Sequence, residues 1–174
     1  MVQYWIATSN WYKEIPKNYR PCSSAVHRNE RHIWWYSMRR DYNIHVGDMV
    51  LVYQSCDNKE AKKENIKIDN EIKCSFIGNF TIGRLIDRDD PTNVPRIQDC
   101  WTEPDDGWLR TVEDNFLWQN EFIKRRDIDD DLLKTITGSK NVGLVFRNKT
   151  WIRLAGTDGY NYYNRVMDKH YNQP

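Results

Sequence analysis

An uninterrupted apolar segment behind a tight turn is the feature that most constrains how this chain folds. The turn is Val46-Gly47-Asp48, and the segment runs from Met49 to Gln54. A strand with one solvent-exposed face alternates apolar and polar residues, whereas a strand covered on both faces is apolar throughout. Residues 49–54 therefore predict a strand with packed layers on both of its faces.

Further strands are expected where β-branched and aromatic residues gather between loop signals. These segments are residues 2–8, 74–87 and 109–124, the last with its centre at 116–123. Gly78 and Gly83 interrupt the second segment, and a glycine inside a strand marks a bulge or a bend.

A hairpin and three helices complete the predicted elements. Two alternating segments, 142–147 and 150–154, flank Asn148-Lys149 and predict the hairpin. The predicted helices are 28–40, 126–136 and 158–167. About five or six strands with two or three helices and no βαβ rhythm favour an α+β fold, a small, mostly antiparallel β-barrel with peripheral helices.

The length and composition indicate one ordinary folded domain. The 174 residues match a single domain spanning 1–174, with a polar insertion at about 57–73. The composition, 39% apolar and 29% charged, excludes collagen-like chains, and no apolar run approaches the roughly 20 residues of a membrane helix. No signal-peptide pattern opens the chain, which predicts an intracellular, cytoplasmic protein with no membrane partner.

The four cysteines show no metal-binding or redox spacing. They are Cys22, Cys56, Cys74 and Cys100, and no pair has the C-x-x-C spacing of zinc or thioredoxin-like sites. For an intracellular protein this predicts reduced thiols.

Charge and aromatic content both bear on the class of partner. The net charge is +1, but residues 87–131 hold 6 Lys and Arg against 14 Asp and Glu, while residues 132–174 hold 7 against 2. Residues 1–55 are also basic, so the two ends form a basic face if they meet, and ordinary solvated surface otherwise. The 8 Trp, 10 Tyr and 5 Phe suit a packed core and equally suit stacking on unpaired bases.

Several motifs occur in the same order as in one known family. The first strand ends in Ser at Tyr4-Trp5-Ile6-Ala7-Thr8-Ser9, and an Arg28-Asn29 pair follows. The most specific block is Val46-Gly47-Asp48-Met49-Val50-Leu51-Val52-Tyr53-Gln54-Ser55, and Ile82–Asp87 with Asp90-Pro91-Thr92 comes next. In these motifs the chain resembles the EVE domain family of the PUA-like superfamily, which is related to YTH and ASCH domains.

The resemblance implies a PUA-like barrel with a pocket for one nucleobase, often a modified one. Similar modules recognise targets in modification-dependent restriction systems, where base flipping delivers the base. It thus implies a non-catalytic nucleic-acid reader, with DNA slightly favoured over RNA and with a fused or associated motor or nuclease subunit as a further partner.

Such a reader needs rings that stack on the base, polar groups for its edge, and cations for the phosphates. The expected base-binding residues are Ser9, Asn10, Trp11, Tyr12, Asn29, Tyr53, Gln54, Ser55 and Trp101. The expected phosphate-binding residues are Arg28, Arg39, Arg40, Lys124, Arg125 and Arg126. The alternatives are core packing for the rings, turn or helix capping for the polar groups, and solvated faces for the cations.

Catalysis is the main competing class. An ASCH-like ribonuclease would use histidines such as His27 and His32 as acid and base, and an RNA-binding PUA-like protein is a related alternative. No phosphate-binding glycine motif, nucleophile motif or complete calcium loop is present in the sequence. We therefore expect no catalytic residues, no metal and no cofactor. A protein-binding module without a nucleic-acid role is the remaining alternative.

Overall fold

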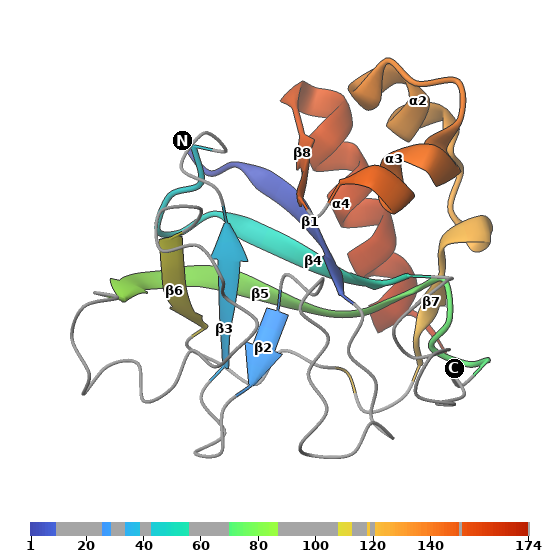
Figure 1. Ribbon diagram of the computed structural model, residues 1–174. Helices are drawn as coiled ribbons and strands as arrows, with labels where there is room; N and C mark the ends of the chain where they lie inside the picture. Colours follow the sequence, from blue (N-terminus) through green and yellow to red (C-terminus); the bar gives the residue numbers. More distant parts are fainter. Residues whose placement is uncertain are drawn as a thin grey trace.

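The computed structural model describes residues 1–9, 26–28, 34–38, 43–55, 70–86, 108–112, 118, 121–149 and 151–173 (Figure 1). In chain order its strands are β1 (Tyr4–Ser9), β2 (Val26–Arg28), β3 (Trp34–Met38), β4 (Met49–Gln54), β5 (Ser75–Ile86), β6 (Trp108–Val112), β7 (Ile123–Lys124) and β8 (Trp151–Leu154). Its helices are the 3-10 turn η2 (Arg125–Asp127), α2 (Asp131–Thr137), α3 (Val142–Asn148) and α4 (Gly156–Tyr171). The fold is α+β, as the sequence predicts.

The strands form one mixed sheet in the order β2-β3-β6-β5-β4-β1-β8, and β7 pairs with the start of β5. Among the described strands β1 and β4 run parallel, from Tyr4 opposite Met49 to Ser9 opposite Gln54, and the other pairs are antiparallel. The pairing of these strands leaves the sheet open at β2 and β8. Because β1 and β4 are parallel, their carboxyl ends lie at the same edge of the sheet.

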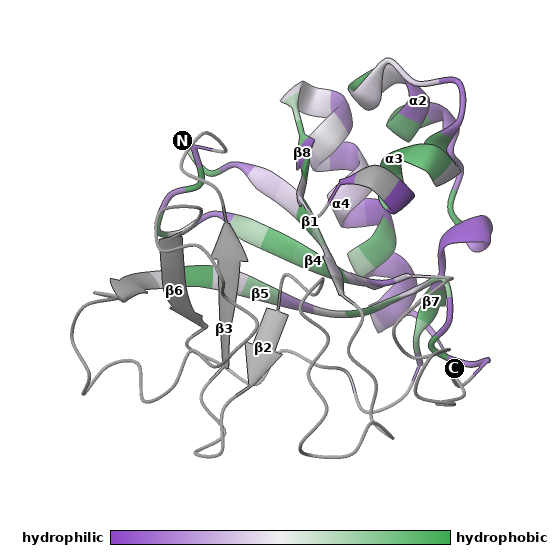
Figure 2. Ribbon diagram, viewed as in Figure 1, coloured by the Kyte–Doolittle hydropathy of each residue, from purple (hydrophilic) through white to green (hydrophobic). Residues whose placement is uncertain are grey.

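Strand β4 is covered on both faces, as its apolar run predicts. Leu51 and Tyr53 join the core beneath the helices, whereas Val50 and Val52 are fully buried outside that core cluster, on the opposite face. Figure 2 colours the middle of β4 green, which marks its apolar residues.

The helices α2, α3 and α4 lie together on one side of the sheet (Figure 1). The last of them was predicted from its apolar spacing, and it buries Tyr162, Tyr163, Val166 and Met167 against the sheet. The helix predicted at 126–136 is confirmed only from Asp131 onward, as α2, because residues 125–127 form the separate turn η2. Asp131 lies in the first turn of α2, where the helix dipole favours negative charge.

The two glycines of β5 coincide with irregular pairing. The register between β4 and β5 shifts next to Gly78, and the register between β5 and β6 shifts between Ile82 and Leu85, a stretch that includes Gly83. The predicted breaks in this strand are therefore confirmed as local shifts that leave the strand continuous.

The helix predicted at 28–40 is wrong. Its ends form β2 and β3, which pair antiparallel with His27 opposite Trp35. The reason is the aromatic run at 34–36, since Trp and Tyr fit a pleated surface better than a helix. Asn29, which follows β2, lies outside the described residues.

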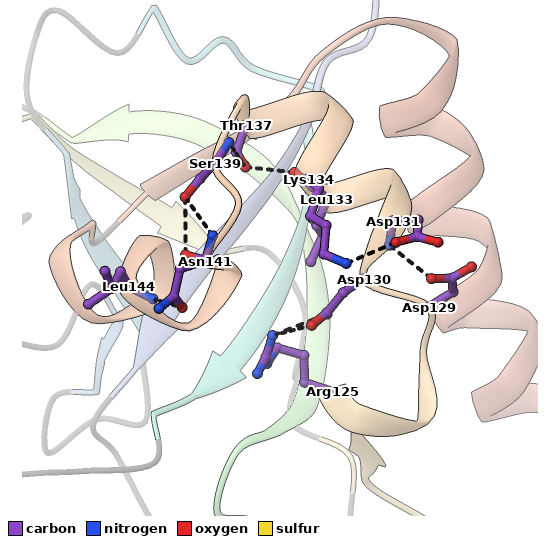
Figure 3. Close-up of polar contacts among 10 residues, drawn as sticks. All are labelled: Arg125, Asp129, Asp130, Asp131, Leu133, Lys134, Thr137, Ser139, Asn141 and Leu144. Carbon is purple, nitrogen blue, oxygen red and sulfur yellow. Dashed lines mark hydrogen bonds and ion pairs between the residues drawn. The ribbon is translucent and has the colours of Figure 1, made fainter.

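The hairpin predicted at 142–154 is also wrong. Residues 142–148 form α3, whose Asn141 side chain accepts a hydrogen bond from the Leu144 N–H at 3.3 Å (Figure 3). Val142, Val145 and Phe146 are buried at the i, i+3, i+4 spacing of one helix face. Strand β8 pairs with β1 instead of with residues 142–147.

The described ends of the strand predicted at 109–124 form β6 and β7, and residues 113–117 and 119–120 between them lie outside the described residues. Cys74 is disulfide-bonded, which corrects the prediction of reduced thiols; Cys22, Cys56 and Cys100 lie outside the described residues. Within the described parts of the chain, no helix has the length and apolar character to cross a membrane.

Candidate functional site

The carboxyl ends of β1 and β4 bring together residues that the sequence predicts to bind a base. Ser9 lies opposite Gln54, Gln54 lies opposite Ser75 of β5, and Ser75 lies opposite Lys124 of β7. Four strands thus present three polar residues and one cation along one edge of the sheet. Ser55 follows at the exit of β4.

Gln54 is the unusual member of this group because its side chain is completely buried. Among the described residues, its Nε2 donates only a long 3.5 Å hydrogen bond to the Ser55 carbonyl, and its Oε1 has no hydrogen-bond partner. A buried amide oxygen without a partner is rare in folded proteins and costs roughly 1–3 kcal/mol. The site therefore contains an acceptor that is free to accept a hydrogen bond from a ligand or a water molecule.

Ser75 and Lys124 have structural partners nearby. The Ser75 hydroxyl lies 3.1 Å from the carbonyls of both Glu71 and Lys73. The Lys124 ammonium donates to the Lys73 carbonyl at 2.7 Å and to the Asn70 carbonyl. Both side chains hold the turn before β5, so two of the three N–H donors of the Lys124 ammonium have structural acceptors.

Tyr53 is a core residue and not a surface for base stacking. Only 1% of it is exposed, and its ring lies 4.3 Å from the Phe146 ring and 5.3 Å from the Phe76 ring, between centroids. Burial raises the pKa of the Tyr53 hydroxyl, an effect that the nearby Arg125 partly opposes. The alternation of β4 explains the outcome, because Tyr53 shares the helix-facing side with Leu51.

The two arginines of the predicted cation cluster, Arg125 and Arg126, differ in how closely an acidic residue holds them. Arg125 donates to both carboxylate oxygens of Asp130, at 3.0 and 3.1 Å (Figure 3). Its guanidinium carbon lies 5.4 Å from the centroid of the Phe146 ring. Arg126 is 83% exposed and has only a 3.9 Å approach to Asp127. Of these two, Arg126 alone is available to a phosphate.

Several predicted residues lie where the structure gives no side-chain position. Ser9 and Arg28 are placed by their backbone at the ends of β1 and β2. The others lie outside the described residues: Asn10, Trp11, Tyr12, Asn29, Arg39, Arg40 and Trp101. Of the two histidines proposed for a ribonuclease, His27 lies within β2 and His32 is outside the described residues.

The opposite end of the same strands holds a polar cluster that sequence reasoning missed. The buried Asp48 carboxylate accepts N–H bonds from the Gln3 backbone at 3.0 Å, the Trp5 indole at 3.1 Å and the His45 backbone at 2.9 Å. The Gly-Asp turn was the available signal, because a carboxylate beside two strand starts is placed to accept their unpaired N–H groups. Asp48 therefore joins the starts of β1 and β4.

An open cavity of about 500 Å³ adjoins this cluster. Its lining residues are Met1, Val2, Gln3, Asn43, His45, Val46, Gly47, Asp48 and Arg153. The described residues contain no group of three His, Cys, Asp or Glu side chains arranged to hold a metal ion.

Comparison with known proteins gives information about the fold and none about the function. No family model matches the chain, and no curated protein matches it. A solved structure titled as a hypothetical protein from Leishmania major is similar, with a TM-score of 0.50 and 14% identity, over 99% of this chain and 98% of that one. At that identity the similarity concerns the fold alone.

Proposed function

We propose that this chain is a non-catalytic reader of nucleic acid, in which a flipped and modified base binds at the carboxyl ends of β1 and β4. The observation that carries the proposal is the buried amide oxygen of Gln54, which has no partner within the described part of the chain. It lies at the edge where Ser9 and Ser55 also lie. A base presents N–H donors on its edge, and a buried acceptor discriminates strongly between ligands that supply a donor and those that do not.

A PUA-like barrel, which the EVE resemblance implies, is part of this proposal. The sheet order separates β2 from β1 by four strands, yet the two strands approach one another. This approach supports a sheet curled towards closure. The curl would enclose the face of β4 that carries Val50 and Val52, and the exit of β4 would then lie at the mouth of the barrel.

The energetics require more than one kind of contact. Extruding a base costs a few kcal/mol, and stacking on an aromatic ring returns about 1–3 kcal/mol. Edge hydrogen bonds and phosphate contacts must supply the remainder. Since Tyr53 is in the core, the proposal assigns stacking to Trp11, Tyr12 or Trp101.

Fluorescence anisotropy with labelled methylated, hydroxymethylated and plain DNA duplexes and matching RNAs tests the proposal. We expect salt-dependent binding with a preference for one modified base, and we expect DNA to bind somewhat more tightly than RNA. Failure of all probes to bind at low salt would overturn the reader proposal. Cleavage of the RNA probes, with or without divalent metal, would favour the ribonuclease instead.

The Gln54→Leu variant makes the test specific to the site. It removes the unpartnered amide at similar volume, so we expect weaker base discrimination with a melting temperature at least equal to that of the parent. Asn79→Leu is the matched control, because the Asn79 amide oxygen already accepts a 2.9 Å bond from the Trp118 indole. That control should lose stability and keep its base preference. A fused or associated motor or nuclease subunit would make use of this recognition.

A further inference from the structure

We propose that residues 146–149, which end α3 and lead to β8 and are here called the α3–β8 turn, bind the sugar–phosphate backbone of the nucleic acid through Arg147 and Lys149. This inference rests on the proposed function and adds the path of the strand that flanks the bound base. Neither residue was among the cations expected from the sequence, because residues 142–154 were predicted to form a hairpin.

Two contacts place this turn beside the base site. The Thr8 hydroxyl donates to the Lys149 carbonyl at 3.0 Å, and Thr8 immediately precedes Ser9 at the end of β1. The Phe146 ring lies 4.3 Å from the ring of Tyr53, which immediately precedes Gln54. Residues 146–149 therefore border the carboxyl ends of both parallel strands.

The side chains of the turn are available for an outside anion. Arg147 and Lys149 are exposed, and no ion pair within the described residues involves either of them. Lys124 and Arg125, by contrast, are held by backbone carbonyls and by Asp130. Arg147 and Lys149 therefore add two exposed cations to Arg126, the member of the predicted cluster that remains available.

The surrounding charge supports an anionic partner. Residues 132–174 carry 7 Lys and Arg against 2 Asp and Glu. Arg125 lies over the Phe146 ring and forms an ion pair with Asp130, so the charge of that carboxylate is neutralised. Asp127 and Asp129 are the exposed carboxylates before α2, and Asp127 lies beside Arg126. A basic turn next to a base site fits the phosphates that flank the extruded nucleotide.

The test compares the salt dependence of binding between charge-neutralised variants. The variants are Arg147→Gln, Lys149→Gln and the double substitution, and the probe is a short methylated DNA duplex. Lys140→Gln is the matched control, because Lys140 is equally exposed but lies in the loop between α2 and α3. Each lost phosphate contact should flatten the plot of log K against log salt by about 0.9.

We expect both single variants to flatten the slope, the double variant to flatten it by roughly twice as much, and the preference for the modified base to remain. Lys140→Gln should keep the parent slope. If the parent binds and the variants keep its slope, or if Lys140→Gln changes it equally, this inference fails and the reader proposal stands. If the parent binds no probe, the reader proposal itself fails.

Discussion

The junction between β8 and α4 leaves no room for a side chain, and Gly159→Ala is the change that tests this closeness. Gly159 lies in the first turn of α4 and is buried. A Cβ atom added there would overlap the carbonyl group of Leu154 and lie 3.0 Å from its Cα. Carbon atoms attract one another at roughly 3.5–4.0 Å, so the added methyl group falls inside the repulsive range.

The expected loss follows from two opposing effects. Alanine favours a helix interior over glycine by about 0.8–1.0 kcal/mol. Overpacking costs about 1–3 kcal/mol where side chains can adjust, and the obstacle here is backbone at the end of β8. We therefore expect the free energy of unfolding to fall by about 2 kcal/mol or more, a decrease in melting temperature of about 4–8 °C.

Urea denaturation followed by tryptophan fluorescence and by circular dichroism measures this loss. Gly143→Ala in α3 is the control, since its Cβ would meet only the Asn141 side-chain oxygen, at 3.3 Å. The control should stay within about 1 kcal/mol of the parent. A Gly159→Ala protein as stable as the parent would refute the close packing of α4 on β8.

Three further predictions concern the core and the cysteines. Burial raises the pKa of Tyr163 to about 12 and raises that of Tyr162 as well, so both hydroxyls keep their protons in the folded state. Their contribution to stability should therefore be complete below about pH 10 and fall as the pH rises towards 12, and phenolate absorbance should appear at a higher pH than in the unfolded chain. Asp48→Ala should lower the free energy of unfolding by about 3 kcal/mol or more in urea denaturation, because three N–H donors, that of Trp5 among them, lose their acceptor. Cys74 should resist alkylation in denaturant until a reductant is added, and mass spectrometry that finds it modified without reductant would contradict the disulfide.

The sequence predicted those parts of the fold in which one local pattern dominates. β4 follows from its continuous apolar run behind Gly47, and α4 follows from apolar residues at helical spacing. The error over 142–148 arose where two patterns competed. The segment alternates like a strand, yet Asn141 is a good N-cap and Val142, Val145 and Phe146 form a helix face.

The candidate site was less predictable because it depends on pairing between distant segments. Ser9 and Gln54 were expected to act together, but their parallel register depends on a crossover that contains β2 and β3. Alternation along β4 alone would have placed Tyr53 in the core, but the resemblance of residues 46–55 to the EVE family assigned it to the base pocket. The availability of Arg126 and the pairing of Arg125 depend on where Asp130 lies, which charge patterning does not reveal.

The position of β1 between β4 and β8 has a consequence for folding during synthesis on the ribosome. β1 is made first, but its second neighbour, β8, ends about 145 residues later. At a synthesis rate of about 5–20 residues per second, the edge of β1 that pairs with β8 stays unpaired for roughly 7–30 s. During that interval a nascent chain exposes the unpaired backbone of Trp5 and Ile6, which is the kind of edge that recruits other strands.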